Sequence, residues 1–121
     1  MNIEIKFRGI GIDSEEWVYG GSFQVSEEDG LVPYIFCPVS GGVPVKPKTV
    51  GQFTTIKDKS GNEVYNGDKV QILHKGQKVI CEVVWNKLGM WSLKWADGYI
   101  NNHYLIPENI KVVGNIYETD F

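Results

Sequence analysis

The sequence TVGQFTTIKDKSGNEVYNGDKV, residues 49–70, contains two strands and two turns in one short run. The pattern predicts a strand over 50–56 and a return strand over 63–65. The loop between them holds Gly61, which can take a positive φ. Gly67 and Asp68 then form a second tight turn. These residue types shape the backbone and include no nucleophile with its base and no metal-ligand cluster. The run therefore predicts a fold but no chemistry.

The two-residue period of strands also precedes this run. It predicts an opening half-buried strand over 3–7, ended by Gly9, and a second strand over 17–25 that bends at Gly20 and Gly21. Residues 31–39 carry Pro33 and Pro38. Because proline cannot donate to a sheet ladder, we expect an edge strand or an extended connector there. Residues 40–48 are expected to form an exposed loop.

After the run, the pattern predicts hairpins that turn at 75–76, 86–89 and 97–98. Trp91, Leu93 and Trp95 form the clearest amphipathic strand of the chain. A one-turn helix is expected at 107–109, before a last strand over 110–117. Roughly nine or ten short strands in a chain of this length are typical of an all-β barrel or sandwich.

The composition is that of a folded globular protein. Hydrophobic residues make up 42% of the 121 residues and charged residues 22%, which is far from the composition of disordered chains. The N-terminus lacks the pattern of a secretion signal, and no window approaches the roughly 18 apolar residues of a membrane span. We therefore expect a soluble, unexported protein. Cys37 and Cys81 have no metal-binding or redox spacing, and both are expected to be buried thiols rather than a disulfide.

Charge is unevenly distributed along the chain. Residues 45–96 carry nine lysines and four acids, a balance of +5, whereas residues 1–44 carry seven acids and two basic residues, a balance of −5. The basic segment could form a face that binds nucleic acid. We favour the alternative that these lysines lie on the solvated faces of strands, protect sheet edges, or pair with the acidic segment.

Three blocks of the chain resemble the YopX family of phage and prophage proteins. They are IKFRG at 5–9 followed by EWVYG at 16–20, the run at 49–70, and VGNIYE at 113–118. Thr55-Ile56 stands where the family more often has glycine and leucine. The resemblance implies an all-β fold of two small barrel-like subdomains, a gene carried by a bacteriophage, and expression in the bacterial cytoplasm. It implies no known activity.

We expect one YopX-like domain over 1–121 with two subdomains, an N-terminal β lobe over 1–65 and a C-terminal barrel over 66–121. The second is expected to be SH3-like, with at most one or two short helical turns in the chain.

An enzyme is not predicted. His74 and His103 are the two imidazoles, and we expect His74 at a solvent-facing turn and His103 in a loop or at a strand edge. Asp58 and Asp68 occupy turn positions, where an aspartate caps backbone amides. We therefore predict no catalytic, cofactor-binding or metal-binding residue.

The favoured interpretation is a binding module. Its partner would be a host or phage protein, or further copies of the chain added strand to strand at an exposed sheet edge, with 31–39 among the candidates. The alternatives are a nucleic-acid-binding accessory protein that uses the basic segment, and an enzyme without a readable site.

The candidate surface combines lysines with aromatic rings and consists of Lys69, Lys78, Lys87, Lys94, Trp95 and Tyr99. Most rings of a small domain are core, so Trp95 and Tyr99 are the best candidates for exposure. Lysines that share a face with an exposed ring would favour single-stranded nucleic acid. An apolar border around the ring would favour a protein partner or self-association.

Overall fold

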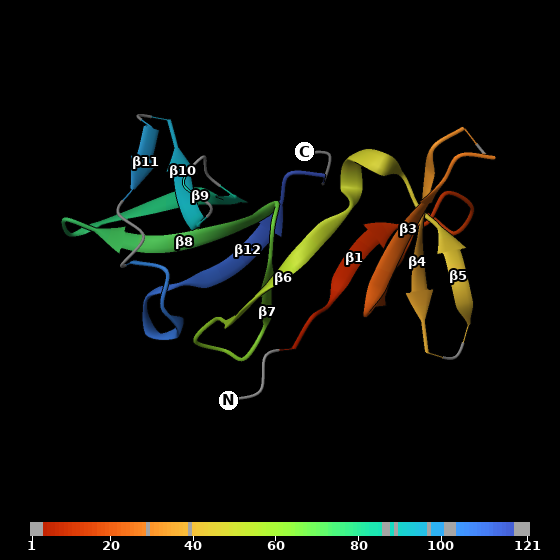
Figure 1. Ribbon diagram of the computed structural model, residues 1–121. Helices are drawn as coiled ribbons and strands as arrows, with labels where there is room; N and C mark the ends of the chain where they lie inside the picture. Colours follow the sequence, from red (N-terminus) through yellow and green to blue (C-terminus); the bar gives the residue numbers. More distant parts are fainter. Residues whose placement is uncertain are drawn as a thin grey trace. The chain divides into compact units, whose positions relative to one another are not determined.

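The computed structural model describes residues 4–28, 30–38, 40–85, 88, 90–96, 98–100 and 104–117 (Figure 1). The chain divides into two compact units, Met1–Phe53 and Thr54–Phe121. Strands and single 3₁₀ turns are the regular elements in both, so the expected all-β class is confirmed. None of the described helical turns is long and apolar enough to cross a membrane.

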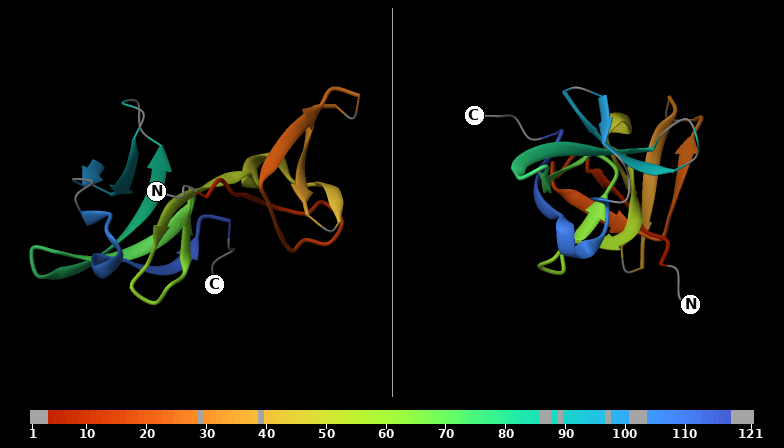
Figure 2. Two further views of the ribbon diagram at one scale, coloured as in Figure 1. Left: turned by 60° about the horizontal axis from the view of Figure 1, so that its bottom comes forward. Right: turned by 90° about the vertical axis from the view of Figure 1, so that its left-hand side faces the viewer.

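The described residues of the first unit form five complete strands, one 3₁₀ turn and the beginning of a sixth strand. They are β1 (Phe7–Ile10), β2 (Trp17–Gly20), β3 (Ser22–Ser26), β4 (Val32–Cys37), β5 (Gly41–Pro44), η1 (Pro47–Thr49) and β6 (Gly51–Lys57). β1 pairs antiparallel with β2 and with the start of β6. β3, β4 and β5 form a separate antiparallel sheet in that order (Figure 2).

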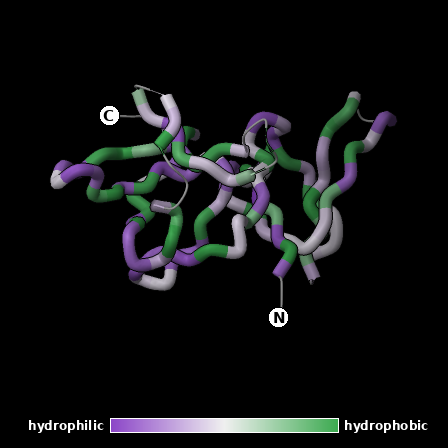
Figure 3. Tube along the Cα trace, turned by 60° about the vertical axis from the view of Figure 1, so that its left-hand side comes forward, coloured by the Kyte–Doolittle hydropathy of each residue, from purple (hydrophilic) through white to green (hydrophobic). Residues whose placement is uncertain are grey.

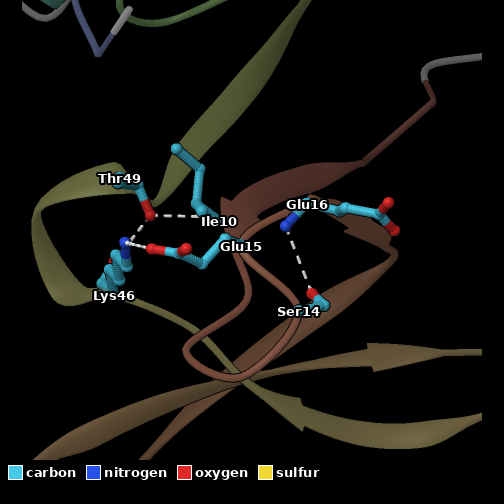
Figure 4. A network of polar contacts seen from close by, with 6 residues as sticks. All are labelled: Ile10, Ser14, Glu15, Glu16, Lys46 and Thr49. Carbon is cyan, nitrogen blue, oxygen red and sulfur yellow. Dashed lines mark hydrogen bonds and ion pairs between the residues drawn. The ribbon is translucent and has the colours of Figure 1, made fainter. Parts of the chain in front are cut away.

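The loop between β1 and β2 is tied to η1 by a polar network (Figure 4). The buried hydroxyl of Thr49 accepts a hydrogen bond from the Ile10 N–H at 2.8 Å and donates to the Lys46 carbonyl at 2.7 Å. The Lys46 ammonium also reaches the Glu15 carboxylate at 3.1 Å. Because that ion pair is exposed and exposed pairs contribute little, the buried hydroxyl is the main tie.

The expectation of a strand over 3–7 ended by Gly9 is wrong. Residue 3 lies outside the described residues, Ile5 is 60% exposed, and β1 begins at Phe7 and continues through Gly9. A Cβ on Gly9 would lie 2.9 Å from a methyl carbon of Val45 and 3.1 Å from one of Ile35. Close packing against two fully buried side chains, rather than strand termination, therefore explains the glycine.

The expected edge strand or connector over 31–39 is wrong for the described residues 31–38, because β4 is the central strand of its sheet. Pro33 is tolerated near the beginning of β4, and its carbonyl accepts a hydrogen bond from the Val45 N–H at 2.9 Å. Pro38 follows the last residue of the strand. The expected loop over 40–48 is also wrong in part, since it contains β5 and the start of η1.

The second unit contains a five-stranded antiparallel sheet. Its elements after β6 are β7 (Glu63–Tyr65), β8 (Asp68–His74), β9 (Gln77–Trp85), β10 (Trp91–Trp95), β11 (Gly98–Ile100), η3 (Pro107–Asn109) and β12 (Lys111–Asn115). The order in the sheet is β11-β10-β9-β8-β12, and β8 and β9 form its long central hairpin (Figure 1).

In the described part of the chain the two end strands of this sheet, β11 and β12, do not pair. The sheet is therefore open, whereas a closed barrel was expected. Residues 104–110, which precede β12, contribute to the core, because Leu105 and Ile110 are buried in it.

Alternation of apolar and polar residues builds the core of the second unit (Figure 3). Val70, Ile72, Cys81, Val83 and Leu93 are each at most 2% exposed and project to one face of the sheet. Burial of this apolar surface is the main driving force for folding.

The first unit ends at Phe53, earlier than the boundary we expected after residue 65. Val64 and Tyr65 are buried, and Val64 belongs to the core of the second unit. The buried Asp68 carboxylate accepts a hydrogen bond from the Tyr65 N–H at 2.7 Å. These contacts fix β7 in the second unit.

Candidate ligand-binding face

The outer face of the five-stranded sheet, opposite the core, gathers three of the nine lysines of the basic central segment. Side chains alternate across a strand and paired residues share a face. The paired residues of neighbouring strands therefore identify the side chains that lie side by side. We use the name outer face for Lys69, Gln71, Leu73, Lys78, Ile80, Glu82, Val84, Lys94, Tyr99 and Lys111. Ser92 has the same alternation but is buried.

One row of the outer face crosses four strands. Tyr99 of β11 pairs with Lys94 of β10, Lys94 pairs with Glu82 of β9, and Glu82 pairs with Lys69 of β8. The Tyr99 side chain is exposed, with a relative accessibility of 64%, and Lys94 is also exposed. The exposed ring of Tyr99 thus lies at the end of a row of alternating charges.

The other rows add two lysines and two exposed apolar residues. Ile80 pairs with Gln71, which pairs with Lys111, and Lys78 pairs with Leu73. Ile80 and Leu73 are 57% and 60% exposed. The outer face carries four lysines and one glutamate, a balance of +3. It is basic although the whole chain has a net charge of −3.

The structure brings together four of the six predicted surface residues, Lys69, Lys78, Lys94 and Tyr99. Lys87 lies outside the described residues. Trp95 lies on the opposite, core-facing side, where it is half-buried and packs against the core.

The exposed tryptophan is instead Trp85, which is 56% exposed. Its ring meets that of Trp91 edge to face, with 4.9 Å between the centroids. By alternation along β9, Trp85 lies on the same side as the core residues Cys81 and Val83. It is nevertheless the last residue of the strand.

His74 does not face solvent as predicted. It is half-buried, and its ring makes edge-to-face contacts with Trp95 and Tyr104 at centroid distances of 5.5 and 5.4 Å. A histidine at the end of a strand can therefore complete an aromatic cluster. His103 lies outside the described residues.

A hollow of about 380 Å³ adjoins the outer face. Gln71, Leu73 and Lys78 line it together with Lys59, Tyr104 and Glu108. Its volume is at the lower end of small-molecule sites. The lining is about equally polar and apolar and includes charges of both signs, which suits part of a larger ligand that lies on the sheet.

The alternation along β9 also predicts the outward residues Ile80, Glu82 and Val84, which were not among the candidates. Lys78, Ile80, Glu82 and Val84 alternate with Val79, Cys81, Val83 and Trp85. Once the second set is assigned to the core, the first set must face outward. Lys111 could not be found in this way, because its position beside Gln71 depends on long-range pairing of β12 with β8.

Two buried carboxylates of the second unit, Asp58 and Asp68, stabilise turns. The Asp58 side chain is 3% exposed and accepts hydrogen bonds from the backbone N–H groups of Ser60, Asn62 and Val112 at 2.8–2.9 Å. Burial alone would raise the pKa of Asp58, but these bonds and one from the Asn62 side chain outweigh it, so the pKa lies below its ordinary value.

Both cysteines are free. Cys81 is buried as expected, and its burial raises the pKa of its thiol. Cys37 is only half-buried, because it is the last residue of β4. Among the described residues, no three His, Cys, Asp or Glu side chains are grouped so that they could hold a metal ion.

A model of the YopX protein family matches residues 6–120, which is nearly the whole chain. The chain belongs to the YopX family. Among solved structures, this YopX family member is similar to protein EF1440 from Enterococcus faecalis, with a TM-score of 0.56 and 16% sequence identity. The alignment covers 96% of this chain and 95% of the other. At this identity the likeness shows a shared fold alone. Comparison with curated proteins gives no match.

Proposed function

We propose that this YopX family protein is a non-enzymatic binding module and that its outer face binds single-stranded nucleic acid. The observation that carries the proposal is the row in which the exposed ring of Tyr99 adjoins Lys94, with Lys69 two strands further along. The sequence favoured a protein partner, and we now place nucleic acid first because lysines and an exposed tyrosine share one face.

The charge of the outer face suits a phosphate backbone. Its four lysines are distributed over β8, β9, β10 and β12, so they span the width of the sheet. A strand of nucleic acid laid across the sheet would meet lysines along its path, and each neutralised phosphate would release a counterion. The acidic balance of the whole chain does not oppose such contacts, because charges beyond about 8–10 Å are screened at physiological salt.

The exposed tyrosine supplies the second ingredient of single-strand binding. Bases stack on aromatic rings without sequence preference, and each stacked base contributes about 1–3 kcal/mol. Tyr99 is well exposed on the outer face, beside Lys94. A base stacked on its ring would place the neighbouring phosphate within reach of that lysine.

The roles of the carboxylates support a non-enzymatic protein. Asp58 and Asp68 are both buried and accept hydrogen bonds from backbone N–H groups. A catalytic carboxylate needs access to substrate and a pKa near the working pH, whereas Asp58 has a lowered pKa. The half-buried His74 is engaged by two aromatic rings.

Fluorescence anisotropy with a labelled oligothymidylate at about 50 and 200 mM salt tests the proposal. With four phosphate contacts, we expect the logarithm of the affinity to fall with a slope of about −3 against the logarithm of salt concentration. Tyr99→Ala should weaken binding by about 1–3 kcal/mol at both salt concentrations. Lys94→Gln should weaken binding and reduce the slope by about 0.7.

Lys48→Ala is the matched control, because Lys48 is an exposed lysine of the first unit. It should leave binding unchanged. Absence of salt-dependent binding in the native protein, or equal effects of Lys48→Ala and Lys94→Gln, would refute the proposal.

A protein partner is the second candidate, because Leu73 and Ile80 of the same face are also well exposed. An apolar protein contact would be insensitive to salt and would be lost in Ile80→Ser, but not in Lys94→Gln. For either ligand, the family resemblance supports a phage- or prophage-encoded protein that acts in the cytoplasm of the bacterial host.

A further inference from the structure

β3 is an edge strand without the usual protection against pairing. Its sequence, Ser-Phe-Gln-Val-Ser, contains no charged residue, proline or glycine, and among the described residues it pairs on one side only, with β4. Natural edge strands are commonly shielded by lysine, proline or a bulge. β5, at the other edge of this sheet, ends with Pro44, and β12, at an edge of the large sheet, carries a bulge. β3 has none of these devices.

The hydrogen-bonding groups on the open edge of β3 can be assigned from Pro33. In an antiparallel ladder, a residue directs its N–H and C=O toward the same neighbour. The Pro33 carbonyl accepts from Val45, on the far side of β4 from β3. Its partner Val25 therefore forms a non-hydrogen-bonded pair with Pro33 and directs its own N–H and C=O to the open edge. Phe23, two residues away, does the same.

The sequence of β3 is nearly symmetric about its central residue. When two copies run antiparallel with Gln24 opposite Gln24, Ser22 meets Ser26 and Phe23 meets Val25. Phe23 and Val25 then exchange both backbone hydrogen bonds in each of two equivalent pairs. Aromatic and β-branched residues are favourable cross-strand partners. Both side chains lie on one face of β3 and are 40% and 50% exposed, so the pairing would bury apolar surface that is open in the single chain.

We propose that two copies of this protein pair through β3 about a two-fold axis at Gln24, which joins two three-stranded sheets into one six-stranded sheet. The contact is isologous, because the same strand is used by both copies. A five-residue strand buries less surface than a standard interface, so the dimer is weak and depends on concentration. This inference rests on the first unit and is independent of the proposed ligand of the outer face.

Sedimentation equilibrium from about 10 µM to 1 mM tests the dimer, a range suited to a small interface. The native chain should change from monomer to dimer across this range. Gln24→Lys and Gln24→Glu each place two like charges at the axis, and each should raise the dissociation constant by about tenfold or more. An equimolar mixture of the two variants places opposite charges at the axis and should restore dimers.

Leu31→Lys is the control, because Leu31 is exposed and lies outside β3. It should leave the dissociation constant unchanged. Circular dichroism of the Gln24 variants should match that of the native chain, since Gln24 is exposed and retains its backbone bonds to β4. A native chain that stays monomeric at every concentration refutes the proposal. So does a dimer that survives both single variants, or a mixture that fails to restore it.

Discussion

The Asp58 carboxylate accepts a hydrogen bond from the backbone N–H of Val112 at 2.9 Å, across 54 positions of sequence. The same carboxylate caps the loop of the β6–β7 hairpin through Ser60 and Asn62. One buried side chain therefore holds a local turn and fixes β12 beside it. The Lys59 N–H, which donates to the Ile110 carbonyl at 3.2 Å, adds a second link between the same segments.

Asp58→Asn should lower the free energy of unfolding by about 2–4 kcal/mol at neutral pH, because buried N–H groups lose an ionised acceptor. Since the folded-state pKa of Asp58 is lowered, its contribution is present above the unfolded pKa of about 3.9 and is lost as pH falls toward the folded value. Urea titrations at several pH values measure this effect. The difference between native protein and variant should shrink below about pH 4, and a difference that stays constant with pH would contradict this assignment.

Gly20→Ala should destabilise the protein by about 2–3 kcal/mol, the range of an overpacked core. A Cβ on Gly20 would overlap the backbone carbonyl of Phe36, which cannot move without breaking β4. Gly21→Ala is the matched control, because the nearest atom to its Cβ would be the Ile5 carbonyl oxygen at 3.8 Å. Thermal unfolding of both variants provides the measurement, and equal melting temperatures would disprove the packing argument.

Thr55→Gly should stabilise the protein by about 0.5–1 kcal/mol. Thr55 has a φ of 72° in β6 and is exposed, so a β-branched residue occupies left-handed backbone without burying its side chain. Relief of about 1–2 kcal/mol of strain exceeds the entropic cost of glycine in the unfolded chain. Thr55→Ala retains the Cβ and should give no comparable gain in chemical denaturation, and a loss of stability in Thr55→Gly would contradict the argument.

Cys37 should react with a thiol reagent in the folded protein, whereas Cys81 should react only after unfolding. Burial raises the pKa of Cys81 and excludes the reagent, and the thiolate is the reactive species. Mass spectrometry of the labelled protein identifies the modified cysteine. Cys37→Ser should remove labelling under native conditions, and rapid labelling that persists in this variant would show that Cys81 is accessible.

Glu82→Gln should tighten binding of single-stranded nucleic acid, because Glu82 lies between Lys94 and Lys69 in the sheet. Removal of its charge raises the balance of the outer face from +3 to +4. Anisotropy titration at low salt should show the largest gain, since screening reduces the effect as salt rises. Glu108→Gln tests whether the hollow beside the outer face shares the effect. Weaker binding in Glu82→Gln would indicate that the carboxylate itself contacts the ligand.

Local patterns were sufficient for most strands and turns. Gly61 and Gly67 have φ values of 88° and 92°, as their turns require, and Pro107 begins the expected one-turn helix as η3. The predictions were wrong where a residue contacts side chains that are distant in the sequence. Gly9 packs closely against Val45 and Ile35. Pro33 lies in a central strand, where its carbonyl accepts a hydrogen bond from the Val45 N–H. Neither contact has a local signature.

The sequence by itself determined the all-β class, the positions of most hairpins and the separation of core from solvent-facing residues, because each depends on side-chain period and turn residues close along the chain. Tertiary structure decided which strands became neighbours. It placed Tyr99, Lys94 and Lys69 in one row, turned Trp95 to the core side, and left β3 at an edge. Those outcomes depend on pairing between distant segments, which the register of the sheets fixes and a local pattern does not encode.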